Sequence, residues 1–248
     1  MIILSIFFFI TAILYSSVGF GGGSTYLALL LIWNVPYYIF PVIALLCNII
    51  VVSGNSFNYV KAGHHNFKLL IPFLIGSIPL AFLGGTLIID KEIFEILLFL
   101  VLTVAGLLLL IKNKSYEEKV VKINIPHLFI SLLIGSTLGL ISGIVGIGGG
   151  IFLSPILFLL KADKPKNIIT TASLFILINS ISGLMGQLTK ENILNEILLY
   201  YPLFISVFIG GLLGNFLNLK IFTNRLLALT TSLLVIFVAI RMGLKIFI

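Results

Sequence analysis

The sequence predicts an all-α integral membrane protein: eight transmembrane helices in two parallel four-helix repeats, with the first helix of each repeat broken at a glycine-rich motif. Composition is the first reason, because 60% of the 248 residues are hydrophobic, 9% are charged, and the mean hydropathy is +1.25. Soluble domains average about 45–50% apolar and about 25% charged residues. The second reason is duplication. Gly19-Phe20-Gly21-Gly22-Gly23 returns 127 residues later as Gly146-Ile147-Gly148-Gly149-Gly150.

The predicted spans are apolar runs of the length that crosses a bilayer, about 20 residues. Polar or proline-marked segments separate them, and the first charged residue of the chain is Lys61. In chain order the runs are 1–33, 41–60, 69–89, 93–111, 126–160, 167–188, 197–219 and 226–247.

The first run of each half is longer than one crossing requires. As straight helices, 1–33 and 126–160 would extend roughly 50 Å at 1.5 Å per residue, against a hydrocarbon core of about 30 Å. Glycine costs a helix about 1 kcal/mol relative to alanine, so three in a row predict a break. Each run is therefore either a kinked crossing or a span followed by a half-helix that folds back.

The halves correspond beyond the glycines. Asn48 matches Asn179, and Pro72 matches Pro202. We expect one transmembrane domain, with repeats at 1–111 and 126–248 and a polar linker at 112–125. If every run crosses once, each half crosses an even number of times and both halves run the same way, which is the parallel-repeat arrangement.

The formal charge of +7 comes from basic residues in the short gaps between apolar runs. That distribution suits lipid headgroups and topology control, so the predicted partners include the lipid bilayer and no nucleic acid. With both termini on one face, that face carries nine basic residues and the other six, which favours cytoplasmic termini.

A helix that begins after each glycine break, at Ser24 and at Ile151, presents unpaired N–H groups and about half a positive charge. Two such ends form an anion site without a basic side chain, and no Lys or Arg occupies the middle of a span. The competing interpretation is that the glycines only permit close helix crossing. The predicted substrate-binding residues are Gly19, Gly21, Gly22, Gly23, Ser24, Thr25, Asn48, Gly146, Gly148, Gly149, Gly150, Ser154 and Asn179.

The motifs GFGGGS at 19–24 and GIGGGIFLSPIL at 146–157 resemble those of the sulfite exporter TauE/SafE family, also called the toluene-sulfonate uptake permease family, over essentially the whole chain. The resemblance implies a bacterial or archaeal inner-membrane permease for a sulfur oxyanion or an organosulfonate such as sulfite or sulfoacetate. One position departs from the repeat: Pro155 follows the second motif, whereas Ala28 occupies the matching place in the first.

Two other classes remain open. An anion channel could use the same glycine breaks through backbone polar groups. A membrane-embedded enzyme is disfavoured, because the spans contain no HExxH or GxSxG motif. We expect no cofactor and no metal site. The single cysteine, Cys47, forms no multi-cysteine metal motif, and His64-His65 has no nearby carboxylate in sequence. The sequence leaves the oligomeric state undetermined.

Overall fold

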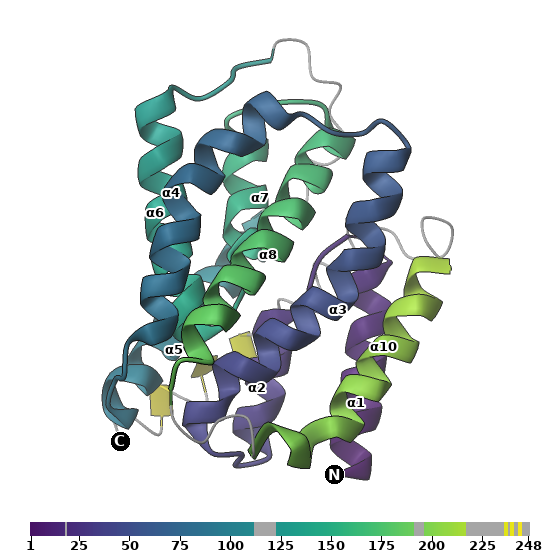
Figure 1. Ribbon diagram of the computed structural model, residues 1–248, viewed down its shortest axis with the longest axis vertical. Coiled ribbons are helices and arrows are strands. Elements are labelled where there is room, and N and C mark those ends of the chain that lie inside the picture. The colour runs from purple at the N-terminus through teal and green to yellow at the C-terminus, as the bar shows by residue number, and fades with distance from the viewer. Residues whose placement is uncertain are drawn as a thin grey trace.

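The computed structural model describes residues 1–17, 19–111, 123–190 and 196–216, with short pieces at 236–237, 239–240 and 243–244. The described residues are helical and contain no strand (Figure 1). The predicted span at 226–247 and most of the 112–125 linker lie outside them. The helices are α1 (Ile2–Ser16), α2 (Gly23–Ile32), α3 (Phe40–Lys61), α4 (Phe67–Thr86), α5 (Lys91–Ile111), α6 (Leu128–Val145), α7 (Gly150–Leu159), α8 (Pro165–Gln187) and α10 (Tyr201–Phe216).

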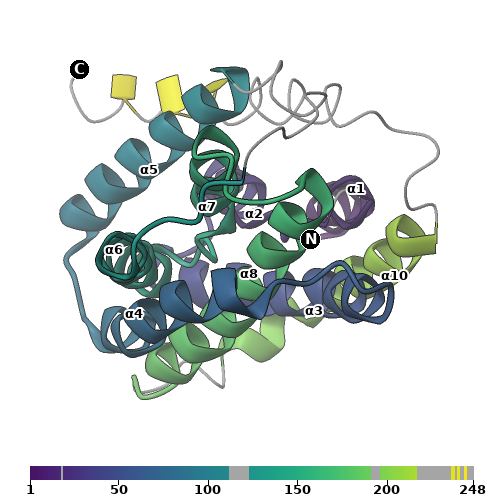
Figure 2. The ribbon, with the colours of Figure 1, turned by 90° about the horizontal axis from the view of Figure 1, so that it is seen from above.

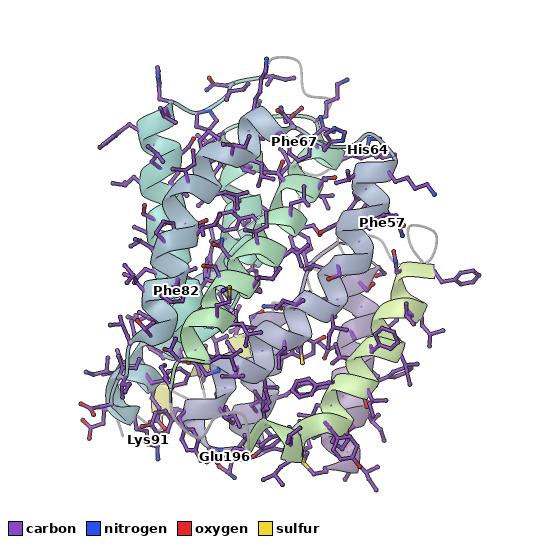
Figure 3. The ribbon with its side chains drawn as sticks, viewed as in Figure 1. Phe57, His64, Phe67, Phe82, Lys91 and Glu196 are labelled. Atoms are coloured by element: carbon purple, nitrogen blue, oxygen red, sulfur yellow. The ribbon has the colours of Figure 1, made fainter. Side chains whose placement is uncertain are left out.

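The outer surface of the bundle is apolar. Large side chains such as Phe57 and Phe82 point outward from their helices (Figure 3), and Phe57 is 69% exposed. Five helical segments of the described chain are long and apolar enough to cross a membrane. A surface of this kind belongs in hydrocarbon, so the structure has the character of a membrane protein.

Both glycine motifs interrupt their helices. The first separates α1 from α2 and the second separates α6 from α7. Gly22 and Gly149 cap the following helices in the left-handed conformation, with φ of 86° and 74°. Residues with a side chain rarely adopt that backbone conformation, which explains why glycine occupies both positions. The two later helices begin at Gly23 and Gly150, one residue earlier than expected.

Each broken run folds back to the face from which it entered. Phe7, near the start of α1, packs against Trp33 at the end of α2, with ring centroids 5.5 Å apart. Before α6, the amide of Asn124 donates to the carbonyl of Lys161, which follows α7, at 3.1 Å. Both motifs therefore form re-entrant pairs of helices, and the alternative of a kinked crossing is excluded.

The two re-entrant pairs enter from opposite faces. One face, here the Tyr38 face, contains the α2–α3 connection, and Tyr38 there donates to Glu196 at 2.5 Å. The other, the Asn66 face, contains the α7–α8 connection, where Asn66 donates to Asp163 at 2.6 Å. Helix α3 leads from the first face to the second. Figure 1 accordingly shows α2 in the lower half and α7 in the upper half.

The prediction of two parallel repeats is therefore wrong. It assumed that each apolar run crosses the membrane once, whereas the runs 1–33 and 126–160 return to their starting faces. The chain therefore enters the first half at α1 from the Tyr38 face and the second half at α6 from the Asn66 face, so the halves are inverted relative to each other. The lysine count per face changes too. Lys61 and Lys68 lie on the Asn66 face, opposite the N-terminus, whereas the sequence prediction grouped them with it (Figures 1 and 3).

The two halves pack against each other through the same kind of glycine contact at two helix crossings. A Cβ on Gly84 of α4 would collide with the carbonyl oxygen of Leu140 on α6, and one on Gly214 of α10 would collide with that of Ile13 on α1. These residues match under the sequence repeat, so α4–α6 and α10–α1 are equivalent crossings. Small residues allow such close approach of helix backbones. Viewed along the long axis, α8 lies centrally in the bundle (Figure 2).

Candidate functional site

The half-helices α2 and α7 point their N-termini toward each other from opposite faces. Each has ten residues, about 15 Å at 1.5 Å per residue, which is half of a hydrocarbon core of about 30 Å. Their N-termini therefore meet near mid-depth. In the view along the long axis they lie close together (Figure 2).

The two breaks are in direct contact. A Cβ added to Gly23 would lie 2.7 Å from the carbonyl oxygen of Ile147 in the opposite break, closer than such atoms approach. Glycine at position 23 is thus required by the neighbouring backbone. The contact joins segments more than 120 residues apart in the chain.

Asn48 of α3 lies between the breaks. A Cβ on Gly21 would collide with its Oδ1, and one on Gly148 would lie 2.8 Å from its Nδ2. The Nδ2 donates a long hydrogen bond of 3.5 Å to the carbonyl of Gly146, while the buried Oδ1 has no partner among the described residues. An unpaired buried polar group costs free energy, and a bound ligand that pairs with it would offset that cost. The Asn48 amide, which lies where the two breaks meet, is therefore a candidate ligand-binding group.

Helix α8 lines the other side of the breaks. Ile176 would contact side chains placed at Gly21, Gly148 or Gly150, and Ser180 lies near Gly148. Asn179 follows Ile176 by three residues and so shares its helix face. Asn179 is fully buried, and neither its Oδ1 nor its Nδ2 has a partner in the described part of the chain.

Backbone donors add to this set. The first amides of α2 and α7 that donate backbone hydrogen bonds are those of Thr25 and Phe152. The amides of Gly23 and Ser24, and of Gly150 and Ile151, have no backbone acceptor within the described residues. The Ser24 hydroxyl is likewise buried and unpaired there. Two helix N-termini thus direct free N–H groups and positive dipole ends to one place.

The remaining predicted residues are buried but lie around this centre. Thr25 is hydrogen-bonded to Tyr15 of α1 at 2.8 Å. Gly19 packs against Tyr59, Gly22 against Tyr15, and Gly149 against Phe175. Ser154 lies one turn into α7 and is fully buried. These residues shape or support the breaks, whereas Gly21, Gly23, Asn48 and Gly148 meet directly.

Sequence reasoning missed a polar column on each side of the breaks. Toward the Asn66 face, Ser56 is hydrogen-bonded to Ser173 at 3.1 Å, and Asn55 beside it is buried with no partner in the described chain. Toward the Tyr38 face, Gln187 donates to the carbonyl of Gly143 at 2.7 Å. The signal was available, because the spacing of 131 that matches Asn48 with Asn179 also matches Ser56 with Gln187.

Metal ligation has no support in the described residues, where no group of three or more His, Cys, Asp or Glu side chains could hold an ion. His65 instead packs against Phe67, with ring centroids 4.9 Å apart. In the described helices, charged residues occur toward helix ends and not beside the breaks. The centre therefore offers amides, hydroxyls and backbone N–H groups.

Comparisons with known proteins point to one family. The model of the family described as Sulfite exporter TauE/SafE matches residues 4–242. The probable membrane transporter protein y4hK of Sinorhizobium fredii is 26% identical over 234 residues, 93% of each chain. The probable membrane transporter protein YunE of Bacillus subtilis is 22% identical over 246 residues, 89% of each chain. The probable membrane transporter protein MJ0441 of Methanocaldococcus jannaschii is 29% identical over 192 residues, 74% of this chain and 70% of its own. No solved structure matches significantly.

Proposed function

Because this chain belongs to the sulfite exporter TauE/SafE family of membrane transporters, we propose that it is a permease for a small anion. The proposed substrate is a sulfur oxyanion or an organosulfonate such as sulfite or sulfoacetate. It binds where the N-termini of α2 and α7 meet, and its negative charge is compensated by backbone N–H groups.

The observation that carries this proposal is the convergence of two helix N-termini at mid-depth, where the described part of the chain places no charged side chain. Each N-terminus supplies about half a positive charge, and in a low-dielectric interior that charge acts more strongly than in water. Hydrogen bonds to a charged partner contribute about 1.5–3 kcal/mol each. An oxyanion with several acceptor oxygens uses the amides of Gly23, Ser24, Gly150 and Ile151 together.

Side chains complete the proposed site. Asn48 and Asn179 can each turn an amide Nδ2 toward the anion, and the hydroxyls of Ser24 and Ser180 can donate to it. All four carry buried polar atoms without partners in the described chain. Thr25 and Ser154 extend the polar lining along the two half-helices.

A carrier is favoured over a channel of the same architecture. The central residues are buried, and a hydrogen bond joins neighbouring segments at each face: Tyr38 to Glu196 on one, and Asn66 to Asp163 on the other. A site occluded from both faces fits an inverted-repeat carrier that opens alternately. A conducting channel would instead provide a continuous path.

We further propose that the Asn66 face is cytoplasmic. In the described segments that face carries Lys61, Lys68, Lys161, Lys164 and Lys166, against Lys91 and Lys190 on the Tyr38 face. The positive-inside rule then places the N-terminus outside the cytoplasm of a prokaryotic inner membrane, the reverse of the orientation expected from the sequence.

Uptake and efflux of labelled sulfite, sulfate, thiosulfate, sulfoacetate and taurine in proteoliposomes test the proposal. We expect saturable flux of at least one sulfur oxyanion or sulfonate, with mutual competition among the accepted anions. Non-saturating flux would favour the channel. Flux of neutral or cationic solutes, with none of these anions, would overturn the anion assignment.

A further inference from the structure

Lys190 lies at the inner side of a groove on the Tyr38 face. The groove has a volume of about 470 Å³ and is lined by Tyr37, Tyr38, Pro41, Thr86, Leu87, Ile88, Ile89, Phe94, Ile144, Thr189 and Lys190. This volume is in the range of small-molecule sites. Lys190 is the one charged residue in that lining.

A chain of hydrogen bonds joins Lys190 to the second glycine break. Its Nζ donates to Oε1 of the buried Gln187 at 2.8 Å. The Nε2 of Gln187 donates in turn to the carbonyl of Gly143, three residues before Gly146. The ammonium group is therefore held at the groove by one neutral acceptor, which leaves two of its three donors for another partner.

The ammonium forms no ion pair among the described residues. Partial burial lowers the pKa of Lys190 to about 8. The titratable groups that face the groove are the phenols of Tyr37 and Tyr38, and Tyr38 is bonded to Glu196. Glu191, next in sequence, lies outside the described residues. A partly desolvated cation that has no carboxylate partner among the described residues attracts an anion more strongly than an exposed lysine does.

The repeat-related position on the opposite face lacks this charge. The repeat spacing that matches Asn48 with Asn179 places Tyr59 at the position of Lys190. Tyr59 is buried against Gly19 of the first break. The two positions are thus equivalent under the repeat and different in charge.

The groove reaches close to the centre. Pro41, in its lining, contacts Gly146, and Asn48 lies seven residues further along α3, about 10 Å at 1.5 Å per residue. We propose that the Lys190 groove is a second anion-binding site, present on the Tyr38 face only, where sulfonate or sulfur-oxyanion groups bind before entering or after leaving the central site. This inference rests on the proposed function for its place in transport, and its anion binding can be measured without transport.

Naphthalene-1,5-disulfonate is a suitable probe, because its charge does not change near neutral pH and its size prevents passage through the closed centre. Its dissociation constant is measured by calorimetry on the purified protein at pH 7. We expect Lys190→Gln to raise this constant about tenfold, which corresponds to the loss of one charge-assisted hydrogen bond, and Lys190→Arg to preserve it. Lys91→Gln, on the same face but outside the groove lining, should leave it unchanged.

The pH dependence has a defined sign. Because the lysine loses its proton as pH rises through about 8, binding should weaken between pH 7 and 9 in the parent and remain constant in Lys190→Arg. A cation after the end of α8 also stabilises that helix, but such a role would not make disulfonate affinity follow pH in this way. Equal affinities of the parent and Lys190→Gln would overturn the inference.

The last part of the test is the membrane face from which disulfonate acts. In right-side-out and inverted vesicles, disulfonate should inhibit anion flux from the Tyr38 face, and Lys190→Gln should raise the inhibitory constant on that face alone. An equal change on both faces would overturn the inference. Parent protein that transports none of the anions but binds disulfonate through Lys190 would refute the proposed function and leave the groove assignment intact.

Discussion

Gly23 at the start of α2 and Ile147 in the second break are in backbone contact: a Cβ on Gly23 would lie 2.7 Å from the Ile147 carbonyl oxygen. One side chain at this position would separate the two helix N-termini. The contact also joins the inverted halves at their centre, so the geometry of the proposed site depends on it.

We expect Gly23→Ala to reduce anion flux at least tenfold while the protein still inserts and purifies as a monodisperse species. The added methyl group would strike the Ile147 carbonyl and the Asn48 amide and displace the N–H donors. Initial rates in proteoliposomes measure the effect. Gly211→Ala is the matched control, because Gly211 is a helical glycine of α10 whose added Cβ would meet its nearest atom at 3.7 Å. Equal loss in both variants would argue against the contact.

Asn48→Ala and Asn179→Ala should weaken transport without weakening the fold. Loss of a hydrogen bond to an anion costs about 1.5–3 kcal/mol, so we expect KM to rise about tenfold or more. Neither side-chain atom of Asn179 has a partner in the described chain, and the one hydrogen bond of Asn48 is long, at 3.5 Å. Their removal should therefore change thermal stability little. Ser53→Ala is the control on α3, because the Ser53 side chain is exposed and its hydroxyl donates to the carbonyl of Ile49 in the same helix. It should change neither KM nor the melting temperature. A fall in stability with unchanged KM would assign both asparagines to structure.

Gly214→Ala should destabilise the protein by about 1–3 kcal/mol, the usual cost of overpacking. Its Cβ would collide with the Ile13 carbonyl of α1, whereas a Cβ on Gly211 of the same helix would meet its nearest atom at 3.7 Å. Gly211→Ala is therefore expected to be neutral or slightly stabilising. Thermal unfolding of both variants in detergent provides the comparison, and equal melting temperatures would refute the close crossing of α1 and α10.

Breaking the hydrogen bond at one face should make the central site more accessible from that face and not from the other. Tyr38→Phe removes the bond to Glu196. Asn66→Ser removes the bond to Asp163 while retaining an oxygen that can cap α4. Each bond involves a carboxylate, so its loss should shift the population about tenfold or more toward opening on its own face.

The reporter for this shift is Ser180→Cys in a Cys47→Ser background, which contains no other cysteine. Alkylation by a membrane-impermeant reagent should accelerate from the Tyr38 face in Tyr38→Phe and from the Asn66 face in Asn66→Ser. Acceleration from the same face in both variants would contradict the alternating arrangement.

Much of the fold followed from sequence because its physical signals are local. Hydropathy located the apolar segments, and glycine runs located the helix breaks, since three consecutive glycines cannot sustain a helix. The repeat between positions 19–23 and 146–150 extends in the structure to Asn34 and Lys161, which are also 127 residues apart and share an unusual positive φ.

The orientation of the halves could not be predicted in the same way. Whether 1–33 and 126–160 cross or fold back depends on tertiary contacts such as Phe7 with Trp33, and a single fold-back in each half reverses the relation between the repeats. The polar columns were missed for a related reason. Gln187 and Lys190 lie at the end of an apolar run, where a polar residue looks like solvated surface until the groove is visible.

The central claim is that an anion binds between the N-termini of α2 and α7. It is tested most directly by anomalous diffraction from crystals soaked with selenite, the selenium analogue of sulfite, and grown from protein without selenomethionine. The claim predicts an anomalous peak within hydrogen-bonding distance of the amides of Gly23 or Ser24 and of Gly150 or Ile151, lost in Gly23→Ala. Selenium bound only at lysines of the two faces, with none between the breaks, would contradict it.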